Sequence, residues 1–349
     1  MKKKINLLLM FAFAAVILFS TSCKTSSVSM QVLVPGIINV PQDIKKVGII
    51  NRSLPAKGSN VQNILEGIFS GESIMADREG SKNCVHGLSN QLNESPRFEA
   101  ILLESLDLRG TGTKRFATPL HWNVVANYCE LYDLDALVVL ETFDSDISYR
   151  EHSRKRNKKV DDKKVEYTEY IANLLMNVNA GWRIYDIKNR KIVDEDSYMD
   201  DMEWHMSGDT PEEARHGLPQ KRNAINKSGY HAGKQYGIRI SPSWMHVSRA
   251  YYARENDDFK LAKRMVKSQN WEAAAKVWEK YTNNPDPKVA GFACYNMALA
   301  NEMQGELEIA LNWADKAMKK YGLKRAVSYV NILNRRIMDQ ERLRKQMDE

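Results

Sequence analysis

The sequence predicts an α+β protein, in which an α/β layer with an antiparallel meander is followed by an all-α part built from helical hairpins. Two hydrophobic periods support this prediction. Over residues 170–184 every even position is apolar, which is the period of a half-buried strand. From residue 256 onward apolar residues recur at three and four positions, which is the period of amphipathic helices.

The N-terminus has the three parts of an export signal, which we assign to residues 1–22. Three lysines precede an apolar run over residues 7–19, and three small residues then lead to Cys23. The run of about 13 residues is shorter than the ~20 that a membrane-spanning helix needs. We therefore expect the remainder of the chain to be exported.

A cysteine directly after small residues resembles the lipobox of bacterial lipoproteins, in which the thiol is acylated and becomes the new N-terminus. Ser20 stands where that motif usually has an apolar residue. The resemblance implies lipidation of Cys23; ordinary signal cleavage and an uncleaved anchor are the alternatives. Lys24 and its neighbours form no acidic run of the kind associated with surface export in related lipoproteins, which favours an orientation facing the periplasm. We expect the outer membrane, and the inner membrane is the alternative.

The composition is that of a folded chain with enough residues for two domains, at 43% hydrophobic and 27% charged residues. The formal net charge of +7 includes the three signal lysines, so the rest is too weakly basic to indicate nucleic-acid binding. No second long apolar run follows the signal. The N-terminal lipid is therefore the only membrane attachment that we expect.

Three cysteines remain after Cys23, at Cys84, Cys129 and Cys294. An exported compartment permits a bridge between Cys84 and Cys129, and small buried residues on helix faces are the alternative. No CxxC or Cys/His ligand spacing occurs, so we expect no metal and no cofactor.

Residues 23–43 hold turn formers and no sustained period, which predicts a tether. A sheet domain over residues 44–252 follows, opening with alternating strand and helix patterns. These patterns are strands at 44–50, 98–103 and 133–143, and helices that begin at Ser81 and Trp122. The long strand at 170–184 then pairs in a meander with the strands before and after it, and residues 220–236 form a helix with a small-residue face.

Residues 150–164, between two strands of the meander, contain eight basic and three acidic residues. One interpretation is a basic finger at a hairpin tip that meets lipid phosphates or an acidic partner. The other is a solvated, flexible hairpin loop.

The helical part, residues 253–349, contains two hairpins and a charged final helix. Residues 292–317 closely resemble a tetratricopeptide repeat, with Gly305 at the interhelix turn and alanines at the small positions. A first hairpin resembles it at an offset of 36 residues, measured from Ala274 to Ala310.

This resemblance implies a groove for an extended acidic peptide. The corresponding positions are Lys260, Lys263, Lys267, Tyr295, Asn296, Leu299 and Met303. The alternative is that the lysines are the solvated side of an amphipathic helix and that the hairpins only stabilise or dimerise the protein.

We find no HExxH, GxSxG, P-loop or zinc spacing, and we therefore predict no enzyme. Residues 109–114 have a phosphate-loop composition without its spacing. The alternative function is an enzyme or carbohydrate-binding protein with a site near Trp182, Asp200 and His205, where carboxylates and a histidine lie close in sequence.

The mature chain resembles an uncharacterised family of Gram-negative envelope lipoproteins, in which an α/β domain precedes tetratricopeptide-like helices. The segments that carry the resemblance are 47–52, 135–141, 181–186, 233–244 and 295–317. The resemblance supplies no activity. We expect a non-enzymatic interaction or assembly module with a protein partner in the cell envelope.

Overall fold

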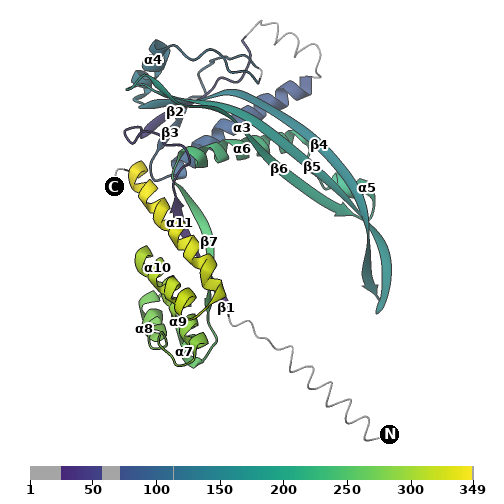
Figure 1. The fold of residues 1–349 in the computed structure, drawn as a ribbon. Coiled ribbons are helices and arrows are strands. Elements are labelled where there is room, and N and C mark those ends of the chain that lie inside the picture. Colours follow the sequence, from purple (N-terminus) through teal and green to yellow (C-terminus); the bar gives the residue numbers. More distant parts are fainter. Residues whose placement is uncertain (1–24, 57–70, 113, 348–349) are drawn as a thin grey trace. The chain divides into compact units, whose positions relative to one another are not determined.

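The computed structural model describes residues 25–56, 71–112 and 114–347 (Figure 1). The signal and Cys23 lie outside the described residues. With 43% helix and 33% strand, an N-terminal sheet domain and C-terminal helices, the α+β prediction is confirmed. The chain divides into a sheet unit, Leu33–Ser243 with Leu343–Glu349, and a helical unit, Met1–Val32 with Trp244–Arg342.

The sheet unit contains a five-stranded sheet of order β3-β2-β4-β5-β6. Strands β3, β2 and β4 are parallel, and β4, β5 and β6 form the antiparallel meander. The strands are β2 (Lys46–Asn51), β3 (Glu99–Leu102), β4 (Ala136–Val160), β5 (Lys163–Asp186) and β6 (Lys191–Gly208).

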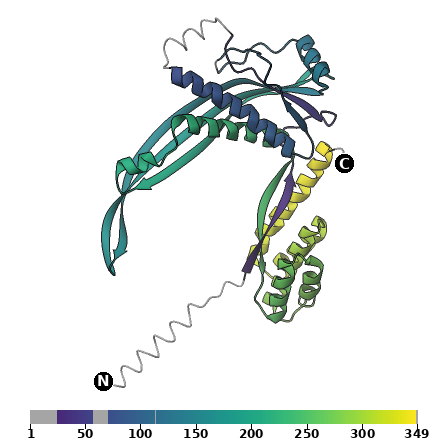
Figure 2. The same ribbon diagram turned by 180° about the vertical axis from the view of Figure 1, so that it is seen from behind.

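Helices α3 (Gly71–Glu94) and α6 (Lys221–Ile240) cover one face of this sheet, as Figures 1 and 2 show. The backbones of the two helices approach closely at Gly233. A Cβ atom added there would lie 1.7 Å from the Cys84 carbonyl oxygen, so only glycine fits. The small-residue face that the sequence shows on α6 thus packs on a helix as well as on the sheet. The other face is covered at its parallel end by α4 (Trp122–Tyr132), whose Val125 packs with Ile50.

Strands β4 and β5 continue well past β6 as a two-stranded ribbon (Figure 1). Strand β6 ends opposite Tyr170, whereas β4 and β5 remain paired to the last residues before the turn. Asp161 and Asp162 form this turn with φ angles of 48° and 61°, the left-handed pair that a two-residue hairpin requires. We name residues 154–169 the arm. The flexible-loop interpretation of this segment is wrong, because each residue has a cross-strand partner up to the turn.

The helical unit contains two antiparallel helical hairpins, a final helix and a two-stranded sheet of β1 (Thr25–Val34) and β7 (Ser243–Tyr252). Its helices are α7 (Asp257–Lys267), α8 (Trp271–Glu279), α9 (Pro287–Met303), α10 (Leu307–Asp315) with a π-helical turn at Lys316–Lys320, and α11 (Lys324–Met347), which belongs to this unit as far as Arg342. Asn256 and Asn270 cap α7 and α8 with their side chains. A short helix, α5 (Pro211–His216), lies in the sheet unit.

Residues 25–34 of the predicted tether form strand β1. Apolar residues alternate with polar ones at Val28, Met30 and Val32, and pairing with β7 satisfies one backbone edge. Sequence reasoning passed over this alternation because the neighbouring prolines and glycine indicated a turn-rich linker. Strand β7 also belongs to the helical unit, so the division of the chain falls before Trp244 rather than at residue 252.

Candidate functional site

The second half of the predicted peptide groove is buried within the helical unit. Tyr295, Asn296 and Leu299 are 5%, 0% and 0% exposed, and Met303 is half-buried. The Asn296 side chain donates to the Tyr252 carbonyl oxygen at 2.7 Å and accepts from the Tyr252 N–H at 2.9 Å. The end of β7 therefore occupies the position that the resemblance assigned to a bound peptide, and these residues do not line an open groove.

The three predicted groove lysines lie on α7, near the surface. Lys260 and Lys267 are exposed and Lys263 is half-buried. Lys260 is paired with Asp257 at 2.9 Å, one turn away on its own helix. Lys263 and Lys267 border a shallow recess beside the first residues of β1. The structure thus separates the predicted lysines from the buried members of the set.

A buried carboxylate on α9 fixes this helix to β7. Glu302 on α9 is fully buried and accepts from the Arg249 guanidinium at 3.0 Å, from the Tyr329 hydroxyl at 2.6 Å and from Arg336 at 2.7 Å. Although burial opposes it, hydrogen bonding by Arg249 and Tyr329 lowers the pKa of Glu302. This network links one strand and two helices, which is a structural role.

The alternative site near Trp182, Asp200 and His205 is not assembled. Trp182 is fully buried and stacks on Tyr236 with ring centroids 4.6 Å apart. Asp200 lies on the same face of the sheet and forms a bidentate ion pair with Arg239 of α6, at 2.7 and 3.0 Å. His205 is an odd number of residues from Asp200 along β6 and is exposed on the opposite face.

The described ranges contain no group of three His, Cys, Asp or Glu side chains that fits a metal ion. Cys84, Cys129 and Cys294 are all buried free thiols, and burial raises the pKa of Cys129 and of Cys294 to about 11. The Cys84–Cys129 bridge that the sequence left open is therefore absent. No helix among the described residues is long and apolar enough to cross a membrane.

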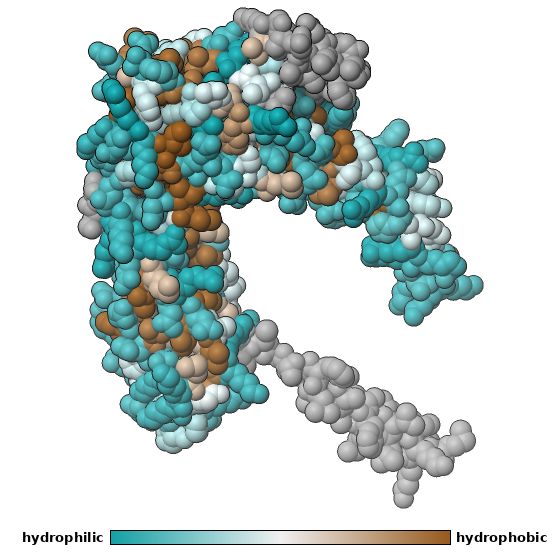
Figure 3. Space-filling view, turned by 45° about the horizontal axis from the view of Figure 1, so that its top comes forward, coloured by the Kyte–Doolittle hydropathy of each residue, from teal (hydrophilic) through white to brown (hydrophobic). Residues whose placement is uncertain are grey.

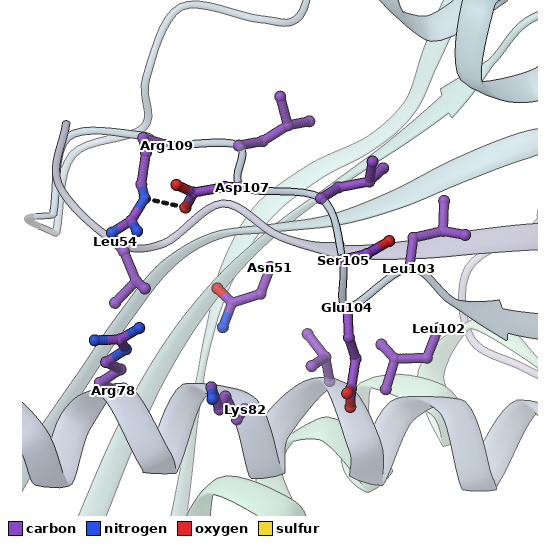
Figure 4. A pocket seen from close by; sticks show the side chains of 13 residues that line it. Asn51, Leu54, Arg78, Lys82, Leu102, Leu103, Glu104, Ser105, Asp107 and Arg109 are labelled. Carbon is purple, nitrogen blue, oxygen red and sulfur yellow. Dashed lines mark hydrogen bonds and ion pairs between the residues drawn. The ribbon is translucent and has the colours of Figure 1, made fainter. Parts of the chain in front are cut away.

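A pocket lies where β2 and β3 end, and we name it the strand-end pocket (Figure 4). Its volume is about 200 Å³. Asn51 ends β2, and residues 102–109 carry the chain away from β3 along one wall. Arg78 and Lys82 stand on α3 and face this segment in Figure 4.

Both carboxylates of the pocket have a close side-chain partner. Asp107 forms an ion pair with Arg109, and Glu104 Oε1 lies 2.7 Å from His86 Nε2. Arg78 and Lys82 are both exposed and make no side-chain hydrogen bond or ion pair with any residue that the structure describes. The described part of the pocket therefore presents an excess of positive charge.

The wall of the strand-end pocket is held by a β-bulge at Glu141. Leu140 pairs with Trp182 and Thr142 with Gly181, so Glu141 is an additional residue on β4. The fully buried Glu141 carboxylate accepts from Arg52 at 3.1 Å, from Arg183 at 3.3 Å and from the Tyr185 hydroxyl at 3.0 Å.

This network reaches the pocket through one arginine. Arg52 Nε donates to the Arg109 carbonyl oxygen at 3.2 Å, and Arg52 Nη1 donates to the Thr118 carbonyl oxygen at 2.9 Å. The segment after β3 is therefore anchored to the end of the central strands. The sequence of β4 alone does not locate the bulge at Glu141, because a bulge is defined by the pairing with the partner strand.

The arm is the most charged part of the sheet unit, with seven basic and four acidic residues. In Figure 3 it is coloured hydrophilic along almost its whole length. Arg154 and Arg156 share Glu169, at 2.5 and 3.0 Å, and Lys155 pairs with Glu166 at 2.9 Å. The four lysines nearest the turn have no carboxylate within ion-pair distance among the described residues; they are Lys158, Lys159, Lys163 and Lys164.

Among the solved structures that resemble the chain is the crystal structure of a neuraminyllactose-binding hemagglutinin homologue from Helicobacter pylori. The likeness has 13% identity and a TM-score of 0.23, and covers 57% of this chain and 84% of that one. At this TM-score it supports no conclusion. No curated protein matches the chain.

Two family profiles match the chain. "Domain of unknown function (DUF6340)" matches residues 260–335, and "Domain of unknown function (DUF8603)" matches residues 44–252. The expected relation to uncharacterised families is confirmed at this level. Because the second profile spans more than half of the chain, the protein belongs to the DUF8603 family.

Proposed function

We propose that this protein is a non-enzymatic interaction module of the bacterial cell envelope, anchored through lipidated Cys23 at the outer membrane and facing the periplasm, and that its arm binds an acidic protein partner. The arm is the observation that carries the proposal. It replaces the helical groove as the docking element, since β7 occupies the centre of that groove.

The arm carries a charge arrangement that is unfavourable in isolation. Lys159 and Lys164 are directly opposite each other across the two strands. Like charges in this position destabilise a ribbon, and Lys158 and Lys163 stand close by on the other face. An acidic surface supplies the missing counter-charges. Relief of the repulsion between the lysines then contributes favourably to the free energy of binding.

The distribution of the lysines favours a protein over a lipid surface. Because residues alternate along a strand, Lys159 and Lys164 share one face, whereas Lys158 and Lys163 lie on the other. A flat bilayer meets only one face at a time. A tip-first approach presents Asp161 and Asp162 of the turn, which anionic lipids repel. A protein partner can contact both faces.

The backbone of the arm adds a second means of attachment. Beyond Leu140 the outer edge of β4 has no neighbouring strand among the described residues, and beyond Tyr170 the same holds for the outer edge of β5. Exposed edges accept an added strand from a partner. The lysines along them oppose pairing between copies of the arm itself.

Site-specific photo-crosslinking from position 157 of the full chain, which leaves all four lysines in place, tests the proposal in intact cells. We expect a crosslinked protein whose captured segment has more carboxylates than basic residues, and we expect the double substitution K159E/K164E to abolish capture. The control K276E/K280E makes the same charge change at exposed positions in and directly after α8 of the other unit and should capture as the parent does. Absence of a crosslinked protein, or capture unaffected by K159E/K164E, would overturn the proposal.

The membrane alternative needs a separate measurement. The chain without residues 1–23 carries neither the apolar signal run nor an acyl chain, so its flotation with vesicles reports on the folded surface alone. We expect equal binding to neutral and anionic vesicles. Preferential flotation with anionic vesicles that K159E/K164E removes would instead assign the arm to lipid.

The lipid anchor is tested by metabolic labelling with a fatty acid. We expect label in the parent chain and none in the Cys23→Ala variant. Equal labelling of the two chains would show that Cys23 is not the acylated residue.

A further inference from the structure

The strand-end pocket lies at a topological switch point of the sheet. Strands β2 and β3 are adjacent and parallel. The chain leaves β2 towards α3, which packs on one face, and leaves β3 towards α4, which packs on the other. Where neighbouring connections diverge in this way, a crevice opens outside the carboxyl ends of the strands, and open α/β sheets bind ligands there.

The charges of this crevice select an anion. Arg78 and Lys82 are four residues apart on α3, so they lie on the same side of the helix with Cβ atoms ~6 Å apart. Both have no partner within the described chain, while the pocket's carboxylates Glu104 and Asp107 are already paired with His86 and Arg109. Two cations at this spacing can contact one anionic group together.

Local hydrogen bonds hold the rest of the site in place. The Asn51 amide donates to the Ser81 hydroxyl at 2.9 Å, and its oxygen accepts from the Ser53 N–H at 3.1 Å and from the Ser53 hydroxyl at 2.7 Å. Arg52 holds the opposite wall through the Arg109 carbonyl oxygen. The walls are therefore held in place by hydrogen bonds within the chain itself, which reduces the entropy cost of binding.

The volume of the strand-end pocket and its lining residues limit the size of the ligand. A volume of about 200 Å³ is below the ~300–1,000 Å³ typical of sites for drug-sized molecules. Leu54, Val85 and Leu102 add apolar surface beside the charged end. The pocket thus fits a molecule with one strongly anionic group and a short carbon body.

We propose that the strand-end pocket binds a small phosphate monoester, with its phosphate between Arg78 and Lys82. A phosphate monoester places close to two negative charges on one group, which matches two cations on one helix turn. A dicarboxylate separates its charges along the carbon chain and matches them less well. This inference concerns a site that the proposed partner binding does not use.

Isothermal titration of the purified full chain with glycerol 3-phosphate tests the proposal. We expect saturable binding that R78Q/K82Q weakens at least about tenfold, because the variant removes both charge-assisted hydrogen-bond donors to the phosphate. R78K should retain part of the affinity. The matched control K227Q/K280Q makes the same charge change at exposed sites outside the pocket and should bind as the parent does.

Succinate, acetate and glycerol serve as the competing ligands. Binding of succinate without glycerol 3-phosphate would overturn the phosphate assignment. Absence of binding by every ligand, or binding that R78Q/K82Q leaves unchanged, would overturn the site. Thermal unfolding of R78Q/K82Q alongside the control distinguishes lost binding from lost folding.

Discussion

Asn296 of α9 holds Tyr252 of β7 by both of its backbone groups, at 2.7 and 2.9 Å. The side-chain amide thus pairs with the strand end as a neighbouring strand would. Phe292 stacks on the Tyr252 ring with centroids 3.7 Å apart, and Tyr295 meets it edge-on at 5.5 Å. A position predicted to bind a peptide has become a fixed internal junction.

We expect Asn296→Ala to lower the free energy of unfolding by about 2–4 kcal/mol, because a buried N–H and a buried carbonyl both lose their partner. Urea unfolding followed by circular dichroism measures the change. Asn312→Ala, at an exposed position of α10, should stay within about 0.5 kcal/mol of the parent. Equal behaviour of the two variants would show that the junction contributes no stability.

The Glu302 network predicts a dependence of stability on pH. Since the pKa of Glu302 is lowered by folding, its stabilisation is present above the unfolded value near ~4.3 and is lost as pH falls through the folded value. Urea midpoints should therefore fall between pH 5 and pH 3 more steeply for the parent than for Glu302→Gln. Parallel curves would contradict this.

Glu302→Gln should also destabilise at pH 7, because it leaves the Arg249 and Arg336 guanidinium groups without a counter-charge in a buried site. Breaking a buried ion pair in this way costs about 3–5 kcal/mol. The same urea series gives this value.

Charge reversal in the arm should separate stability from binding. Lys159→Glu places a carboxylate opposite Lys164 and replaces repulsion by attraction, so the urea midpoint should remain equal or rise slightly. Crosslinking to the partner from position 157 should fall. A variant that loses both stability and binding would indicate that the arm is only a structural extension.

The three buried thiols should be unreactive in the native protein. Burial raises the pKa of Cys129 and Cys294 to about 11 and that of Cys84 further, so little thiolate exists at pH 8. Alkylation followed by mass spectrometry should label all three only in denaturant. Rapid labelling of native Cys84 would contradict its 0% exposure.

Local periodicity predicts local structure in this chain and does not predict long-range pairing. The even-position pattern of residues 170–184 becomes the buried face of β5, and the three- and four-residue spacing after residue 256 becomes α7 to α10. By contrast, β1 depends on β7, whose His246 contacts Gln31 across 215 positions of sequence. Such a partner cannot be found from one strand's own composition.

In the candidate sites, too, the sequence shows the local residue pattern but not the long-range pairing. The basic charge of the arm is visible in sequence, but its extension as a paired ribbon depends on where β6 ends. The strand-end pocket needs Asn51, Arg78 and residues 102–109 together, and only the order of the parallel strands brings them to one edge. The resemblance to the repeat predicts that Asn296 faces an open groove. The strand that covers Asn296, β7, lies outside the repeat, so the repeat sequence alone does not show it.

The position of β1 also has a mechanical consequence. Strand β1 begins at Thr25, so a single residue separates it in sequence from Cys23. Acyl chains on Cys23 would therefore pull on a hydrogen-bonded strand rather than on a flexible tether of about 20 residues. If Cys23 is acylated as we propose, force from the membrane would load the β1–β7 pair and the Asn296 junction.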